Sequence, residues 1–366
     1  MSQIFKYNPS LDGLRGIAVI CVLLVHASYG VISGGFLGVD LFFMLSGYLI
    51  TAILQKEYGL SGTISYLNFY MKRILRLLPP LALCILMYIA YKLFVPNVGV
   101  ENPLLIIYSS LFYFVNVIHE SHLGPMVHLW SLSVEEHFYL FWPVLVAGLL
   151  FKFSKNKQMA FVLFLVLLTS FFRIWIYHTN SVDPIRSGIF SIDSYRFTFC
   201  RIDAILLGAL AAISLSGKTY SFKAKINPNL GLLLLLMPLA LLVLVLDAKD
   251  PIWRYGGFML TNALALLLVV FAIFNPNNRL LANRILLWFG QRSYGIYVYH
   301  YLIFEALEPM RVAGNTTNLI IVTFLRLFIS LVFAEASYRL MEKPILKLKK
   351  KFQNAEIKKA VIFKRS

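Results

Sequence analysis

The sequence predicts an all-α protein, a polytopic membrane helix bundle of about ten transmembrane helices with both termini cytoplasmic. Of the 366 residues, 59% are hydrophobic and only 14% are charged, which excludes an ordinary soluble domain and a disordered chain. Apolar runs recur along the whole chain. The net charge of +17 is concentrated in alternate segments between these runs, as in membrane proteins that obey the positive-inside rule.

Ten apolar runs are long enough, or nearly so, to cross a hydrocarbon core of about 30 Å at about 1.5 Å per helical residue. They cover residues 14–31, 36–54, 77–95, 130–151, 159–177, 197–215, 230–246, 256–274, 285–304 and 319–340. An eleventh run, 104–118, is shorter and ambiguous by length alone.

The charge between the runs predicts the topology. Net positive charge is found in segments 1–15, 56–76, 152–157, 218–225, 279–292 and 343–366, whereas the alternate segments sum to zero or to −1. Basic segments are expected in the cytoplasm, and the alternation is strict only if 104–118 does not cross. We therefore expect 104–118 to be re-entrant or packed on the outer side, where protein has to bury its backbone.

The chain is expected to divide into a transmembrane domain, residues 1–346, and a basic cytoplasmic tail, residues 347–366. The tail is expected to face anionic membrane lipids rather than nucleic acid. Cys21, Cys84 and Cys200 show no CxxC spacing, so neither a metal site nor a disulfide framework is expected. The chain start has no cleavable signal pattern.

Ionisable side chains inside apolar spans are costly, so each suggests a function, although a buried pair can also fix helix packing. Arg15 and His26 share one face of the first predicted helix, with His26 about 16 Å further out. Asp40 lies near the outer end of the second run. Arg73 and Arg76 are neighbours at i,i+3 and suit phosphates, but they could equally be a plain positive-inside anchor.

The segment HLWSLSVEEHFYLFWP is the most unusual, because it gathers His128, Glu135, Glu136 and His137 at the outer start of a span. Carboxylates there are expensive unless Arg or His side chains pair with them. A carboxylate with a raised pKa beside a histidine is also suited to proton transfer.

The predicted topology sorts the polar residues into two groups. The outer half holds His26, Asp40, Glu135, Arg201, Asp203 and His300, and the inner face holds Arg15, Arg73 and Arg76. This arrangement suggests an anionic cytoplasmic ligand that meets a different substrate across the membrane. A row of polar residues could equally form a transport path.

The chain resembles the acyltransferase-3 family of integral membrane acyltransferases over roughly residues 7–346, through motifs that occur in the family's order: LDGLRGIAVICVLLVHA, GVDLFFMLSGYLIT, FYMKRILRLLPP, HLWSLSVEEHFYLFWP and SYGIYVYH with MEKP. The resemblance implies a bacterial cytoplasmic (inner) membrane protein that uses cytoplasmic acyl-CoA, commonly acetyl-CoA. The acyl group would pass to a hydroxyl of an extracytoplasmic or lipid-linked glycan, such as the O-antigen of lipopolysaccharide or an exopolysaccharide. Handling of a polymer could need a periplasmic partner protein.

The resemblance also assigns motif residues. The family's Arg-x10-His motif falls on Arg15 and His26, and its Arg-x-x-Arg motif falls on Arg73 and Arg76. Its Trp-Ser-Leu-x-x-Glu motif falls on Trp130, Ser131, Leu132 and Glu135, and His137 stands where the family usually has glutamine.

The main hypothesis from the sequence is O-acyl transfer, without a metal. His26 would be the general base or form an acyl-histidine, and Glu135 would orient or charge-balance its imidazole. Acyl-CoA would be bound by Arg15, Arg73 and Arg76, and the acceptor by Asp40, Trp130, Arg201, Asp203 and His300.

Two other hypotheses remain open from the sequence. One is a transporter or exporter of a glycan or acyl donor without acyl-transfer chemistry, although the paired broken helices common in transporters are not evident. The other is a membrane sensor or assembly subunit, which would have little reason to bury so many polar groups.

Overall fold

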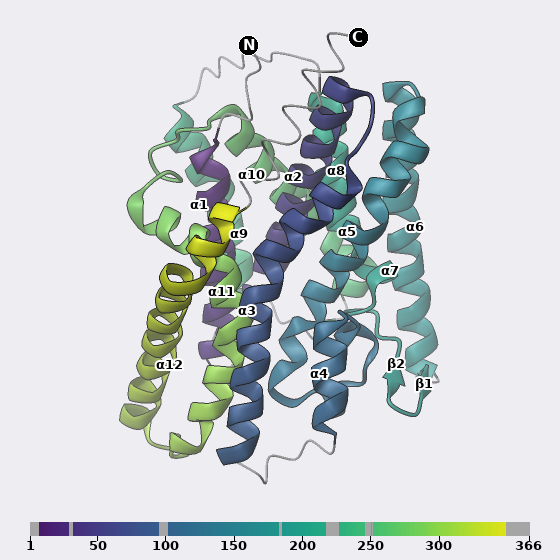
Figure 1. The fold of residues 1–366 in the computed structure, drawn as a ribbon. Helices are drawn as coiled ribbons and strands as arrows, with labels where there is room; N and C mark the ends of the chain where they lie inside the picture. Colours follow the sequence, from purple (N-terminus) through teal and green to yellow (C-terminus); the bar gives the residue numbers. More distant parts are fainter. Residues whose placement is uncertain are drawn as a thin grey trace.

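The computed structural model describes residues 7–28, 32–94, 102–182, 185–216, 227–245, 250 and 252–348, and these form a bundle of long helices (Figure 1). The α-helices are α1 (Pro9–Ala27), α2 (Leu37–Ser61), α3 (Tyr66–Phe94), α4 (Pro103–Leu111), α5 (Trp130–Gly148), α6 (Lys155–Val182), α7 (Thr198–Arg201), α8 (Asp203–Leu215), α9 (Pro228–Val245), α10 (Phe258–Phe274), α11 (Arg284–Leu307) and α12 (Thr316–Ser337).

Shorter elements join or extend these helices. The short helical turns are η1 (Gly34–Phe36), η2 (Val115–Val117), η3 (Glu120–His122), η4 (Gly124–Leu129), η5 (Leu150–Lys152), η6 (Trp253–Gly257), η7 (Glu308–Met310) and η8 (Tyr338–Glu342). Strands β1 (Arg186–Ser187) and β2 (Phe190–Ser191) pair as a single antiparallel ribbon. The predicted tail from residue 349 onward lies outside the described residues.

Eight helical segments among the described residues are long and apolar enough to cross a membrane, and they coincide with eight of the ten predicted runs. The other two runs correspond to α8, which has 13 residues, and α11, which has 24 residues. Four-residue α7 directly precedes α8 and lengthens it, and α11 is less apolar because it carries Arg292, His300 and several tyrosines. The predicted all-α membrane bundle is confirmed.

The run at 104–118 does not form a span. Its helix α4 has nine residues, about 14 Å of helix, which is too short to cross the hydrocarbon core. The chain then turns at Tyr113, which has a positive φ of 57°, and continues through short helical turns to α5. The backbone N–H of His119 donates to Ile189 O at 2.9 Å, so this segment packs against the β ribbon.

Glycines allow two helix pairs to pack backbone to backbone. A Cβ on Gly47 of α2 would lie 1.8 Å from the Ile205 carbonyl oxygen of α8, and one on Gly290 of α11 would lie 1.9 Å from the Asp12 carbonyl oxygen of α1. Small residues give membrane helices this close approach. The α1–α11 contact matters for the site described below, because both helices carry its central residues.

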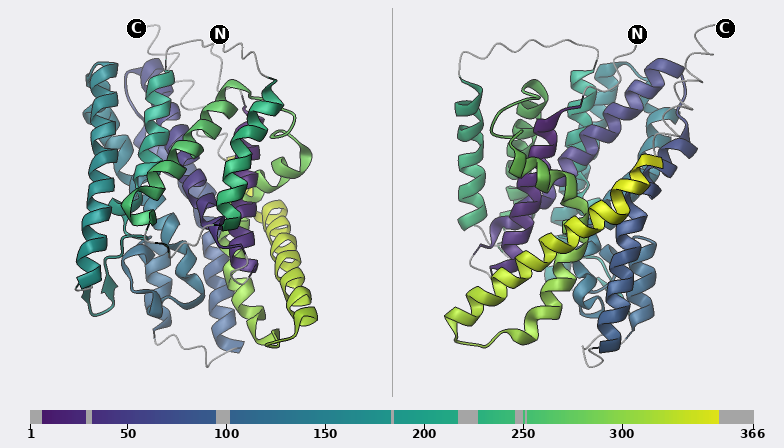
Figure 2. Two further views of the ribbon diagram at one scale, coloured as in Figure 1. Left: turned by 180° about the vertical axis from the view of Figure 1, so that it is seen from behind. Right: turned by 60° about the vertical axis from the view of Figure 1, so that its left-hand side comes forward.

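Contacts at helix ends define one end of the bundle. Ser10 Oγ donates to Asn275 O at 2.6 Å, Asn278 Nδ2 donates to Asn229 Oδ1 at 3.0 Å, and Lys155 Nζ donates to Ser216 O at 2.9 Å. These bonds bring the starts of α1, α9 and α6 to the ends of α10 and α8, as alternating spans require. We call this the basic end; α4 and the β ribbon lie at the opposite, outer end (Figures 1 and 2).

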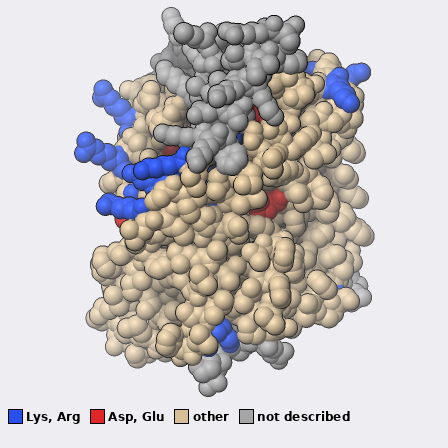
Figure 3. Space-filling view, in the orientation of Figure 1, with Lys and Arg blue, Asp and Glu red and all other residues tan. Residues whose placement is uncertain are grey.

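The surface agrees with this orientation. Figure 3 shows a broad band almost free of charged residues, with most of the visible Lys and Arg side chains toward the basic end. Helix α3 also extends further toward that end than the apolar run 77–95 predicts, because its helix begins at Tyr66. Arg73 and Arg76 therefore lie within a membrane helix rather than in a loop.

Candidate active site

His26 and His300 form the centre of the candidate site. The close α1–α11 contact places His26 Nδ1 2.9 Å from His300 Nε2, and the ring of Tyr301 meets His26 edge-on with the two ring centroids 5.1 Å apart. His300 is completely buried, whereas His26 is partly exposed. The pair lies on the half of α1 that is remote from the basic end.

Backbone carbonyls determine which ring nitrogens carry protons. His300 Nδ1 lies 2.7 Å from Tyr297 O and 3.2 Å from Ile296 O, and a carbonyl can only accept, so His300 Nδ1 carries a hydrogen. In neutral His300, Nε2 is then an acceptor, and His26 Nδ1–H donates to it. This leaves the Nε2 lone pair of His26 free to take a proton from a substrate or to attack a carbonyl carbon.

A second layer of hydrogen bonds supports α11 against the start of α5. Tyr297 OH donates to His128 O at 2.7 Å and lies 2.6 Å from Ser131 Oγ. His128 Nε2 donates to Val298 O at 3.1 Å, and the His128 and His300 ring centroids are 5.3 Å apart. The HLWS motif thus holds the helix that carries His300. The sequence singled out His128 but assigned it no role.

Glu135 does not take the position expected beside His26. Its Oε1 accepts a hydrogen bond from Ser46 Oγ at 3.0 Å, and its Oε2 accepts one from Tyr139 OH at 3.1 Å. Arg73 attracts this carboxylate more strongly than any other charged side chain does. His300, rather than Glu135, is therefore the partner that orients His26. The sequence pointed to His300 through the histidine of the SYGIYVYH segment.

The three predicted arginines of the inner face come together at the basic end. Arg15 and Arg73 are close enough to Arg76 to repel it electrostatically. Arg15 Nη1 forms an ion pair with Asp12 Oδ1 at 2.9 Å, and the guanidinium carbon of Arg73 lies 3.6 Å from the ring centroid of Tyr139. Glu135 and Glu136 also attract Arg73. Arg76 is repelled by both other arginines, and an anionic ligand would relieve that repulsion.

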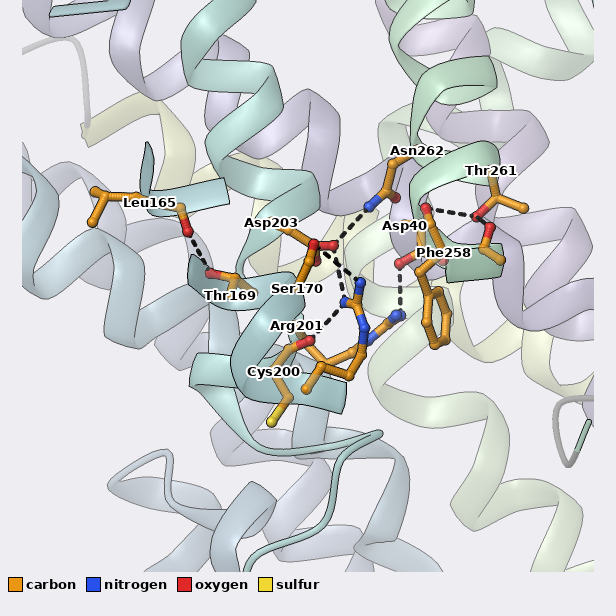
Figure 4. Close-up of polar contacts among 12 residues, drawn as sticks. Asp40, Leu165, Thr169, Ser170, Cys200, Arg201, Asp203, Phe258, Thr261 and Asn262 are labelled. Carbon is orange, nitrogen blue, oxygen red and sulfur yellow. Dashed lines mark hydrogen bonds and ion pairs between the residues drawn. The ribbon is translucent and has the colours of Figure 1, made fainter. Parts of the chain in front are cut away.

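Asp40, Arg201 and Asp203 lie in a buried ionic cluster that joins four helices (Figure 4). Arg201 Nη2 pairs with Asp40 Oδ1 at 2.6 Å, and Arg173 Nη1 pairs with Asp203 Oδ2 at 2.9 Å. Asn262 Nδ2 donates to the same Asp203 oxygen at 3.2 Å. The four charged side chains are at most 2% exposed, so their geometry is that of helix packing.

This geometry differs from the acceptor site expected for these residues. Each charged side chain of the cluster already has an ion-pair partner inside the protein. Arg173 was not singled out from the sequence, because a single arginine in an apolar run reveals no partner. Trp130 faces the same cluster, with the Arg201 guanidinium carbon 5.8 Å from the Trp130 ring and 3.9 Å from that of Phe258.

The described residues contain no cluster of three or more His, Cys, Asp or Glu side chains that could hold a metal ion. The chemistry that His26 can itself supply is proton transfer and nucleophilic attack.

Comparison with known proteins identifies the family. Residues 8–335 match a family model described as an acyltransferase domain, and the chain belongs to this acyltransferase-3 family. O-acetyltransferase OatA of Staphylococcus aureus (strain NCTC 8325 / PS 47) is 31% identical over 365 residues, which cover 93% of this chain and 58% of OatA. No solved structure matches the chain significantly.

A second relative has a name that states an acceptor. YrhL of Bacillus subtilis (strain 168) is provisionally named a peptidoglycan O-acetyltransferase. It is 32% identical over 362 residues, which cover 94% of this chain and 56% of YrhL. The chain thus spans less than two thirds of the length of these curated relatives.

Proposed function

We propose that the protein is a membrane-bound O-acetyltransferase that moves an acetyl group from cytoplasmic acetyl-CoA to a hydroxyl of a cell-surface glycan, in the bacterial cytoplasmic membrane. The observation that carries this proposal is the His26–His300 pair, with Nδ1 and Nε2 2.9 Å apart. Membership of an acyltransferase family and relatives named as O-acetyltransferases support it. The arginine cluster at the basic end supplies a place for the donor phosphates.

The acceptor that we propose to test first is peptidoglycan or its lipid-linked precursor. The support is the name of YrhL; the comparisons do not bear on lipopolysaccharide. Because the chain covers only 56% of YrhL, a polymeric acceptor could require a further domain or an extracytoplasmic partner protein. A short glycan fragment is therefore the appropriate first substrate.

The proposed reaction uses the free lone pair of His26. In direct transfer, Nε2 removes the proton of the acceptor hydroxyl, the oxygen bonds to the thioester carbonyl carbon, and the carbon–sulfur bond breaks. The proton on His26 then passes to the CoA thiolate, so that the products are the acetyl ester and CoA. In the two-step version, Nε2 attacks the thioester carbon, the carbon–sulfur bond breaks and CoA leaves as the thiolate. The acceptor hydroxyl then attacks the resulting acetyl-histidine, the carbon–nitrogen bond breaks, and the hydroxyl proton passes to the CoA thiolate.

The test is acetyl transfer by purified protein in lipid vesicles, with labelled acetyl-CoA and peptidoglycan fragments. His26→Ala is expected to lose about 10²–10⁴-fold in rate, the usual contribution of a general acid–base group. His122→Ala, in a short turn outside the site, is the matched control. Full activity in His26→Ala would refute both versions of the chemistry, and movement of donor or glycan across the vesicle without an acetylated product would favour the transporter.

A further inference from the structure

We propose that Glu135 is a positioning residue for the donor site, which holds Arg73 in place through Tyr139, and that it does not serve His26. This inference rests on the proposed function, because it takes Arg73 to bind the phosphates of acetyl-CoA. The glutamate of the Trp-Ser-Leu-x-x-Glu motif then acts at the donor end of the site, whereas the sequence suggests a role beside His26.

The first step in the argument is that both carboxylate oxygens of Glu135 already have partners. Ser46 Oγ of α2 donates to Oε1 at 3.0 Å, and Tyr139 OH donates to Oε2 at 3.1 Å. Glu135 and Tyr139 are four residues apart on α5, so they lie on the same face of the helix. The carboxylate thus anchors the Tyr139 ring between α2 and α5.

The second step is that the anchored ring supports Arg73. The Arg73 guanidinium carbon lies 3.6 Å from the Tyr139 ring centroid, well within the range of a cation–π contact. The charge of Glu135 also attracts Arg73 directly, and this is the largest favourable charge interaction of the carboxylate. Ring and carboxylate together restrict the guanidinium to one place.

The third step is that this support leaves donor groups of Arg73 available. A ring face holds the guanidinium without accepting its N–H groups in ordinary hydrogen bonds, and Arg73 Nε is buried without a hydrogen-bond partner. A phosphate oxygen would satisfy such a group, because a guanidinium presents its N–H donors as a planar fork that matches phosphate.

The fourth step is that His26 has a different partner. Its Nδ1 is bonded to His300 Nε2 at 2.9 Å, and that bond already determines the proton position on the His26 ring. Glu135 is therefore expected to affect binding of the donor, whereas His300 is expected to affect the chemical step.

The experiment compares steady-state kinetics and direct CoA binding for Glu135→Gln, Arg73→Ala and the double variant. For Glu135→Gln we expect KM for acetyl-CoA and Kd for CoA to rise about tenfold. We expect kcat to stay within about threefold and the pH profile of kcat to be unchanged, as for a residue that contributes to binding rather than chemistry. The double variant should bind CoA no more weakly than Arg73→Ala, because the two residues act as one unit.

Tyr139 provides a second, independent variant. Tyr139→Phe keeps the ring but loses the bond to Glu135, and should weaken CoA binding less than Tyr139→Leu, which removes the ring. Tyr299→Phe is the matched control, because the Tyr299 hydroxyl is bonded 2.8 Å from Ser337 Oγ and contacts neither Glu135 nor Arg73 among the described interactions.

Different failures have different meanings. The proposal would be overturned if Glu135→Gln lowered kcat and shifted the pH profile without changing CoA affinity. Glu135 would then be assigned to His26, as the sequence suggests. Equal weakening of CoA binding by Glu135→Gln in the presence and absence of Arg73 would also overturn it. If the wild-type protein binds CoA but transfers no acetyl group, the proposed function fails, and the CoA-binding comparison still decides the link between Glu135 and Arg73.

Discussion

Two groups of arginines lie inside the same bundle, and their partners differ. Arg173 and Arg201 at the outer half each pair with an aspartate, and all four side chains are at most 2% exposed. At the basic end, Arg73 and Arg76 lie among other arginines, and one of them rests on an aromatic ring. In the first group each arginine forms an ion pair with its own aspartate. In the second group the arginines also repel one another, and an anionic ligand would relieve that repulsion.

This difference teaches that a buried arginine in a membrane helix does not by itself indicate a binding site. A balanced pair has no charge left to offer a ligand, and opening it would expose two ions to a medium of low dielectric constant. An arginine that rests on a ring and is repelled by neighbouring arginines is stabilised when a phosphate binds. The sequence assigned ligand binding to Arg201 as well as to the arginines of the basic end, and the structure separates Arg201 from them.

The largest expected effect is on the outer group. Arg201→Met leaves the Asp40 carboxylate buried without its cation, and we expect a loss of about 3–5 kcal/mol of stability, the usual cost of breaking a buried pair. Thermal and denaturant unfolding in detergent measure it. Arg201→Met combined with Asp40→Leu should recover most of the loss. An Arg201→Met protein that is as stable as wild type but no longer saturates with acceptor would make Arg201 a substrate-binding residue after all.

The next prediction concerns the histidine pair. His300→Phe preserves an aromatic ring but removes the acceptor of the His26 Nδ1–H bond, so we expect kcat to fall about 100-fold, within the range for general acid–base groups. KM for acetyl-CoA should stay within about twofold, because a group that acts only in the chemical step leaves binding intact. Loss of CoA binding in this variant would show that the two regions are not separable.

In contrast to the outer group, variants at the basic end should lose more affinity for CoA than stability. Arg73→Ala combined with Arg76→Ala removes two charge-assisted hydrogen-bond donors, each worth about 1.5–3 kcal/mol, so CoA affinity should fall by at least tenfold. The unfolding midpoint should fall less than in Arg201→Met, because the removal of mutually repelling charges partly offsets the loss of the Arg73 contacts with Tyr139 and Glu135. Isothermal titration with CoA and thermal unfolding of the same sample check both expectations, and a destabilised protein with normal CoA affinity would contradict them.

The smallest effect is expected for an exposed pair outside the spans. Partial burial opposes ionisation of Glu308, but hydrogen bonds from Arg311 and Arg326 outweigh it and lower the Glu308 pKa. The stability that Glu308 contributes is then present above the pKa of an unfolded glutamate and is lost as pH falls through the lower folded pKa. Arg311→Gln removes only the exposed partner of Glu308, and it should cost at most about 0.5–1 kcal/mol at neutral pH, and less in acid. A loss of stability as large as that of Arg201→Met would contradict the expectation that exposed ion pairs contribute less stability than buried ones.

Much of the fold could be predicted, because hydropathy and charge are properties of local sequence. The ten apolar runs and the alternation of basic segments correspond to the helices found, and the short α4 explains why 104–118 does not interrupt the alternation. The boundaries were less accurate. Helix α3 starts at Tyr66 instead of near residue 77, since polar helical turns continue beyond the hydrocarbon core and carry no hydropathy signal.

The candidate site was predicted as a set of residues rather than as a set of contacts. His26, His300 and the three arginines of the basic end were identified, and the structure brings His26 to His300 and the arginines to one another. Glu135 was expected beside His26 and instead contacts Ser46 and Tyr139. A motif spacing states which face of one helix a residue occupies, but it does not state which other helix faces it.

The sequence by itself determined the class of protein and the residues available for chemistry, and it predicted the number and direction of the spans, because these follow from local hydropathy, local charge and short motifs. Tertiary structure alone decided the partners. His26 and His300 are 274 positions apart, and Arg201 and Asp40 are 161 apart. Such pairs depend on which helices pack closely, and the glycine contacts of α1 with α11 and of α2 with α8 set that packing in three dimensions.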